Sequence, residues 1–199
     1  MKYFVNLIFV LLAFIASFGS AKAEDAQPLP APSPDKAQIV FLKPMGGAWG
    51  AFAAGIFDVK GNDTEILGVM HGNAKMTAEV APGQHRFLAA SYTNVGHFLD
   101  ANVEAGKRYY VVVRFIFGQG FQLRPVRRTG PSDFNATNPD FPRWLSDTKP
   151  VEPKAKEVSA FGNDKKRIAK SLAAAQRLWD SKTAEQRAEL TLTPEDSLP

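Results

Sequence analysis

The sequence contains no cysteine, which excludes disulfides, thiolate metal sites, a nucleophilic thiol and a lipid-bearing cysteine. It also lacks a strong excess of one charge, since 24 basic residues stand against 20 acidic ones. A general nucleic-acid-binding protein would show a concentrated basic patch, so that class is not expected. Beyond the N-terminal segment, no run is apolar enough to span a bilayer. Stability must therefore come from a packed core.

The N-terminal residues have the layout of a secretory signal. Lys2 precedes an apolar run from Phe4 to Phe18, and residues 21–23 read Ala-Lys-Ala. We therefore predict that residues 1–23 are a signal peptide cleaved after Ala23, and that the protein is periplasmic or secreted. An uncleaved membrane anchor is the alternative, but the run is interrupted by a polar residue and is shorter than the roughly 20 residues that a span needs.

Alternating prolines mark residues 24–37 as a linker. Each proline fixes φ and removes a backbone donor, which favours an extended polyproline helix. A stiff spacer is the first interpretation of such a tract, and a ligand for a proline-reading partner is the alternative.

From 38 to 126, short apolar runs alternate with turns rich in Gly, Pro, Asn and Asp, which is typical of an all-β domain. The predicted fold class is therefore mainly β, an antiparallel β-sandwich of seven or eight strands with a C-terminal amphipathic α-helix. Met76 and Val80 alternate with polar residues, which places one face of their strand on a core. The strands are expected at 38–43, 52–59, 64–70, 75–80, 84–91, 97–104, 108–117 and 120–126.

The run Arg108–Phe117 is apolar on both faces, with Tyr109 and Val111 on one and Tyr110 on the other. It is predicted to be a central strand that is covered on both sides. Arg114 lies on the second face, where a charge needs a partner or a route to solvent. This position makes Arg114 a candidate binding residue.

Five prolines indicate that residues 127–162 form an irregular arm. An isolated aromatic group lies within it, formed by Phe134, Phe141 and Trp144. We expect these side chains to anchor the arm to the sandwich.

Residues 163–199 are predicted to be a helical segment and tail. An amphipathic helix is expected at about 164–181 with Asn163 as its cap, and a second at Thr183, where Gln186 completes a capping box. The basic residues of the first helix are Lys165, Lys166, Arg167, Lys170 and Arg177. They suggest contact with anionic lipid or cell-wall polymer, but a solvated polar face is the simpler interpretation.

A family resemblance rests on the order of several short segments, none of which is specific alone. They are 39–44, 46–50, 57–61, 82–85 and 105–110. On these segments the region 38–126 resembles an uncharacterised family of bacterial envelope domains, many of them lipoproteins. More distantly it resembles the small PEGA-type and carboxypeptidase-regulatory-like sandwiches. The resemblance implies a sandwich in the bacterial envelope and brings no catalytic residues. The missing cysteine departs from the lipoprotein pattern.

Three histidines raise the question of a zinc or copper site. In the predicted hairpin about residues 93–94, His97 lies opposite Ala90. His85 lies opposite Asn102 in the same register, so the two histidines are roughly 17 Å apart. They are too distant to share an ion, and we expect neither a metal site nor a cofactor.

The glycine-rich segment Gly46–Gly55 lacks the Gly-Lys-Ser/Thr ending of a phosphate loop and is not expected to lead into a helix. It is predicted to be a mobile loop at the end of the sandwich, with Trp49 and Phe52 as candidate binding residues. The alternative is that both aromatics fill the core, as large apolar side chains usually do.

The sequence contains neither G-x-S-x-G nor H-E-x-x-H, and Asp58, Asp63 and Asp100 fall in turns or on polar strand faces without evident pairing. We therefore predict that the protein is not an enzyme but a binding or interaction module of the cell envelope, with an envelope protein or polymer as partner. A structural protein retained at the membrane by an uncleaved N-terminal segment is the second hypothesis. An uncharacterised hydrolase is the third.

Overall fold

The computed structural model describes residues 29–61 and 63–199, with the backbone alone at residues 48 and 49. The chain divides into the units Met1–Pro30 and Ala31–Pro199, and the fold below is that of the second unit. The predicted signal peptide and the first part of the predicted linker lie outside the described residues.

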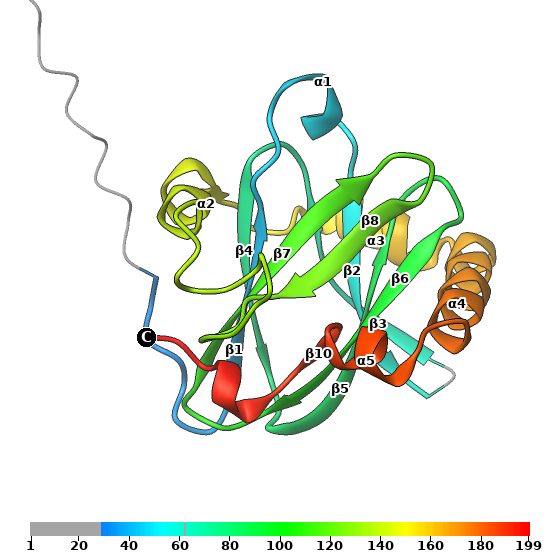
Figure 1. Ribbon diagram of the computed structural model, residues 1–199. Coiled ribbons are helices and arrows are strands. Elements are labelled where there is room, and N and C mark those ends of the chain that lie inside the picture. Colours follow the sequence, from blue (N-terminus) through cyan, green and yellow to red (C-terminus); the bar gives the residue numbers. More distant parts are fainter. Residues whose placement is uncertain (1–28, 62) are drawn as a thin grey trace, which may run out of the picture. The chain divides into compact units, whose positions relative to one another are not determined.

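The described residues form two five-stranded sheets that pack face to face (Figure 1). Sheet A has the order β8-β7-β1-β4-β9, and sheet B has the order β10-β6-β5-β2-β3. The strands are β1 (Ala37–Lys43), β2 (Ala54–Lys60), β3 (Asp63–Met70), β4 (Ala74–Val80), β5 (Gly83–Ala90), β6 (Gly96–Val103), β7 (Arg108–Ile116), β8 (Gly120–Pro125), β9 (Lys149–Pro150) and β10 (Thr191–Leu192). The helices are α1 (Gly47–Gly50), α2 (Phe141–Asp147), α3 (Ala155–Asn163), α4 (Lys165–Asp180) and α5 (Ala184–Ala188), followed by the 3-10 turn η1 (Pro194–Asp196).

All eight predicted strands are present, each within a residue or two of its expected bounds. The prediction of a purely antiparallel sandwich with seven or eight strands is wrong, because both sheets are mixed and each gains a two-residue strand. The chain passes from β4 into sheet B and returns at β7, which then lies parallel to β1. Alternation along a strand defines its faces but carries no information on the direction of its neighbour.

The main core lies between the two sheets and is built from alternate residues of each strand. Phe41 of β1, together with Tyr109 and Val111 of β7, is fully buried there. The prediction that β7 is covered on both faces is confirmed. Its second face is also buried, and Tyr110 there packs edge-on against Phe141 with ring centroids 5.5 Å apart.

Residues 127–162 are more regular than predicted, since they contain α2 and most of α3. The part up to α2 covers the outer face of sheet A, whereas α3 packs against β3 of sheet B. Their aromatic group forms the expected anchor. The Trp144 ring centroid lies 5.8 Å from that of Phe134 and 6.2 Å from that of Phe141. Lys75 of β4 adds a polar contact, donating from Nζ to the Leu145 carbonyl at 2.8 Å.

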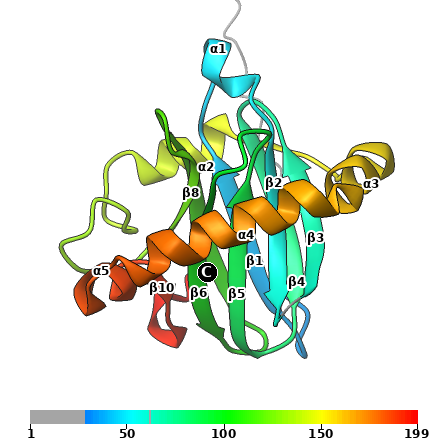
Figure 2. The ribbon, with the colours of Figure 1, turned by 90° about the vertical axis from the view of Figure 1, so that its right-hand side faces the viewer.

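The outer face of sheet B is covered by α4, which crosses β5 and β6 (Figure 2). Ile168, Ala175 and Trp179 are buried against this face, forming a second apolar cluster with Phe98. The helix is capped by Asp164 instead of Asn163, because the Asp164 side chain accepts from the Arg167 backbone nitrogen at 3.0 Å.

Two further expectations for the C-terminal segment have different outcomes. Arg167 is not on a solvated face, because its guanidinium is buried 4.3 Å from the Phe161 ring centroid. The helix predicted at Thr183 is confirmed as α5, with the Thr183–Gln186 capping box in place. Among the residues that the structure describes, no helix combines the length and apolar character needed to cross a bilayer.

Candidate functional site

A groove of about 760 Å³ lies on the outer face of sheet B beside α4. Residues of β5 and β6 form its floor, Leu172 and Gln176 of α4 form one wall, and Val59 of β2 borders it. This volume lies within the range of about 300–1,000 Å³ that is usual for small-molecule sites. We take this groove as the candidate site, and its residues were not among the predicted site residues.

The groove exists because α4 covers only part of the sheet face. Side chains that face each other across β5 and β6 become more polar with distance from the helix. From the helix outwards the facing pairs are Leu88 with Phe98, Arg86 with Asp100, and Gln84 with Asn102. The first pair is buried under α4, the second is half-buried, and the third is exposed.

Arg86 and Asp100 form a bidentate ion pair in the floor of the groove. The Nε–Oδ1 distance is 2.6 Å and the Nη2–Oδ2 distance is 2.8 Å. The guanidinium also lies 5.0 Å from the Phe98 ring centroid and 5.1 Å from that of Trp179. The hydrogen bonds that Arg86 donates to Asp100 raise the pKa of Arg86, so the guanidinium stays protonated. The charges of the pair cancel, and Nη1 takes no part in it.

The remaining polar residues that line the groove are three amides, one histidine and one threonine, namely Gln84, Asn102, Gln176, His85 and Thr191. Gln84, Asn102 and Gln176 each carry both a donor and an acceptor. Gln176 is held in place by donating from Nε2 to Asp180 Oδ1 at 2.7 Å. Val59 and Leu172 supply apolar surface between these groups. The arrangement suits an uncharged ligand with many hydrogen-bonding groups.

Two of the three carboxylates named in the sequence analysis, Asp58 and Asp100, form ion pairs with basic side chains. Asp58 is buried, and its Oδ2 lies 3.1 Å from Nδ1 of His85. His85 Nε2 lies 2.8 Å from the Ala81 carbonyl oxygen. A carboxylate and a carbonyl can only accept, so both ring nitrogens donate and the imidazole is protonated. The hydrogen bond that His85 donates to Asp58 raises the pKa of His85 accordingly.

His85 and His97 lie well apart along the sheet but closer together than predicted, because the hairpin register differs by one residue. His85 faces Ala101 and His97 faces Ala89, which places them four positions apart along the sheet, or roughly 13 Å. His97 is buried with Nε2 2.8 Å from the Gln119 carbonyl oxygen, and burial lowers its pKa. In the described part of the chain, no group of three His, Cys, Asp or Glu side chains could hold a metal ion.

The three predicted site residues do not contribute to the groove. The segment holding Trp49 and Phe52 contains the short helix α1, which the sequence did not predict, and the side chain of Trp49 lies outside what the structure describes. Phe52 stacks on Phe115 with ring centroids 5.8 Å apart and is not a core residue, being 46% exposed.

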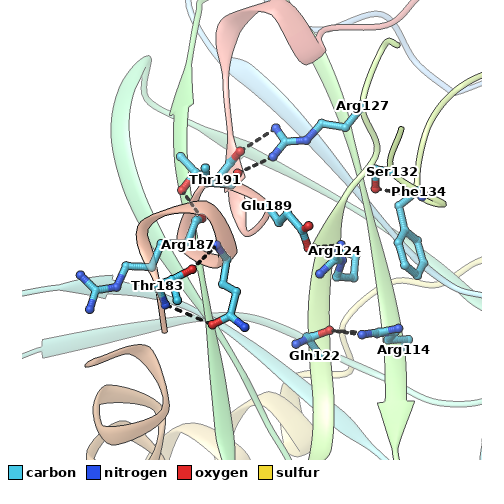
Figure 3. A network of polar contacts seen from close by, with 12 residues as sticks. Arg114, Gln122, Arg124, Arg127, Ser132, Phe134, Thr183, Arg187, Glu189 and Thr191 are labelled. Carbon is cyan, nitrogen blue, oxygen red and sulfur yellow. Dashed lines mark hydrogen bonds and ion pairs between the residues drawn. The ribbon is translucent and has the colours of Figure 1, made fainter. Parts of the chain in front are cut away.

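Arg114 lies on the outer face of sheet A and has the partner that its position requires (Figure 3). Its Nε and Nη2 donate to Oε1 of Gln122 at 2.9 and 2.6 Å, and its guanidinium lies 5.3 Å from the Phe134 ring centroid. Arg124 lies on the same ring at 5.2 Å and pairs with Glu189 at 3.2 Å. Burial lowers the pKa of Arg114.

Lys43 at the end of β1 is a fully buried charged residue that the sequence analysis missed. Its Nζ donates to the carbonyls of Gly50 and Gly72, each at 3.2 Å, and lies 5.4 Å from the Phe121 ring centroid. Burial lowers its pKa to about 8. The burial of Lys43 could have been inferred from the sequence, because residues two positions apart on a strand share a face and Phe41 faces the core.

Replacing Lys43 by methionine is expected to change how stability depends on alkaline pH. The lysine pKa is 10.5 in its ordinary state and about 8 in the fold, so between these values the unfolded chain binds a proton that the folded chain lacks. Wild-type stability therefore rises with pH across this window, by at most about 3 kcal/mol. Lys43→Met should lack this rise in denaturant unfolding, whereas the exposed Lys165→Met should keep it. An equal rise in Lys43→Met would contradict the assignment.

Comparison with protein-family models and with curated proteins gives no match for this chain.

Proposed function

We propose that the protein is a non-catalytic binding module of the bacterial cell envelope whose groove holds a segment of an uncharged glycan. The observation that carries the proposal is the composition of the groove, in which the charges of the Arg86–Asp100 pair cancel and amides and apolar side chains flank it. His85, which also lines the groove, is paired with Asp58. A charged ligand would leave one member of this pair with an unbalanced charge, so an uncharged one is favoured. The signal-like N-terminus and the resemblance of 38–126 to envelope domains support the location.

The chemistry of sugar hydroxyls matches these side chains closely. A hydroxyl both donates and accepts, as do the amides of Gln84 and Asn102. Asp100 adds acceptors and Arg86 Nη1 adds a donor. Facing side chains on paired strands are about 5 Å apart, which is near the width of one sugar ring. The C–H surface of the ring would rest on the apolar wall.

The proposal predicts weak, saturable binding of uncharged oligosaccharides. The probes are chitotriose and maltotriose, with the acidic trigalacturonate for comparison, measured by titration calorimetry on the full chain. Asn102→Ala and Gln84→Ala should each weaken binding about five-fold, the effect of losing one hydrogen bond worth about 1 kcal/mol.

Gln119→Ala is the matched control, because this amide is also exposed but lies in the turn at the other end of the sandwich. It should leave the affinity unchanged. The proposal fails if neither uncharged oligosaccharide binds, if trigalacturonate binds more tightly than both, or if the double variant of Gln84 and Asn102 binds like the wild type.

A further inference from the structure

The end of the sandwich away from the groove is formed by loops from both sheets. Strands β1, β5 and β7 all run towards it, since β1 is parallel to β7 and β5 is antiparallel to β2, which starts there. The loops that meet are 44–53, 91–95 and 117–119, and together we call them the aromatic end. Figure 1 shows α1 and the turn between β7 and β8 on this side of the sheets.

Contacts between neighbouring loops fix the aromatic end. Gly72 in the adjoining turn donates its backbone N–H to the Gly50 carbonyl at 2.7 Å, and Lys43 holds the carbonyls of both residues from below. His97 at the start of β6 contacts the Gln119 carbonyl at 2.8 Å. These hydrogen bonds fix the loops of the aromatic end to the strands from which they emerge.

Each of the three loops presents one exposed aromatic side chain. Phe52 is 46% exposed, Tyr92 is 66% exposed and Phe117 is 81% exposed. In the described part of the chain these are the large apolar side chains with the greatest exposure. Tyr92 also packs on Phe161, with ring centroids 4.8 Å apart, and lies 5.0 Å from the Arg167 guanidinium. Exposed apolar side chains on loops at one end of a domain, unlike single scattered ones, mark an interaction site.

The aromatic end carries no formal charge. Segments 44–53, 91–95 and 117–119 contain no Asp, Glu, Lys or Arg, although 22% of the whole chain is charged. Lys43, at the base of the first loop, is buried and turned towards carbonyls. Nothing in these loops would therefore attract an ionic partner or resist entry into a medium of low polarity.

We propose that the aromatic end docks reversibly on the interfacial zone of a lipid bilayer. Aromatic side chains prefer this zone, and loops without charged residues enter it without desolvating an ion of their own. The charged groups next to these loops are the buried Arg167, which contacts Tyr92, and the Glu157 carboxylate, which contacts His71 in the adjoining turn. The loops also contain no basic residues, which are the residues that make a surface prefer anionic headgroups. We therefore infer that the lipid is neutral. Docking should therefore occur on neutral lipid and should be insensitive to salt.

This surface is independent of the groove and of the proposed function. The groove lies on the outer face of sheet B near Gln84 and Asn102, where β5 begins and β6 ends. The aromatic end lies where β5 ends and β6 begins. A protein docked through its aromatic tips would keep the groove directed away from the bilayer and open to a ligand.

The test uses the absence of cysteine, because one introduced thiol then carries a single fluorophore. Gln119→Cys places the label at the aromatic end, and Lys107→Cys places it in the turn between β6 and β7 at the opposite end. The labelled full chains are mixed with phosphatidylcholine vesicles containing doxyl lipid. We expect quenching of the label at 119 but not at 107, unchanged at high salt and with added phosphatidylglycerol.

The variant Tyr92→Ser/Phe117→Ser should lose at least half of this quenching, while thermal unfolding shows that it still folds. Four outcomes would overturn the proposal: equal quenching at both positions, no quenching at 119, quenching only on anionic vesicles, or a label at 119 already buried without lipid in a dimer of the chain. The first would indicate attachment through another segment, the third an electrostatic contact, and the fourth a second copy as the true partner.

Discussion

Replacing Trp179 by alanine is expected to lower the free energy of unfolding by about 3–5 kcal/mol, the usual cost of removing a buried tryptophan. Trp179 is buried between α4 and sheet B, where its ring centroid lies 6.4 Å from that of Phe98. It also lies under the guanidinium of Arg86. The variant should therefore lose packing between α4 and sheet B. It should also make Arg86 in the floor of the groove less well fixed, which weakens ligand binding.

Chemical denaturation measures the first effect and oligosaccharide titration measures the second. Arg177→Ala is a matched control, because this residue is exposed on the same helix two positions earlier. It should change stability by no more than about 0.5 kcal/mol. A Trp179→Ala variant as stable as this control would mean that α4 does not depend on its apolar face for attachment to sheet B.

Replacing Asp58 by alanine should lower the free energy of unfolding by about 3 kcal/mol, because it removes a buried carboxylate and leaves the half-buried His85 without its charge partner. The pH dependence has a defined sign. The pKa of His85 is raised by Asp58 in the fold, so the stabilisation is complete below about pH 6.5 and is lost as pH rises through the folded pKa. Wild-type stability should fall over that window, and the variant should lack the fall.

Unfolding by denaturant at a series of pH values checks both parts of this prediction. Glu152→Gln, at an exposed carboxylate of the arm, should keep the wild-type dependence. The double variant Asp58→Leu/His85→Phe should recover much of the lost stability, since removing both polar partners leaves neither unsatisfied. A pH dependence that persists in Asp58→Ala would show that another group titrates in its place.

The strands were predictable because their signals are local. Turn residues such as Gly83 and Gly106, both at positive φ, mark where a strand must end or begin. The pairing of strands was not predictable in the same way, because the parallel neighbour of β1 lies far along the sequence. The helix α3 was missed because Pro150 and Pro153 directly precede it and indicated irregular structure.

The groove could not be predicted because its residues look like an ordinary solvated strand face. Asp100 and Asn102 occupy the polar positions of β6, and only the shared face with Phe98 hints at partial cover. Whether such a face becomes a floor or remains open surface depends on where α4 crosses it. That crossing is set by packing between side chains distant in sequence, such as Trp179 and Phe98.

The parallel pairing of β1 with β7 also has a kinetic consequence. Gln38 of β1 faces Arg108 of β7 across 70 residues of chain. Closing so long a loop loses conformational entropy before the β1–β7 contacts can stabilise it. Sheet A is therefore expected to assemble late, and the domain is expected to fold slowly. A chain emerging from synthesis has β1 long before it has β7, and β1 cannot take its central place until then. This delay keeps the polypeptide unfolded for longer, which is the state that the predicted export of this chain would require.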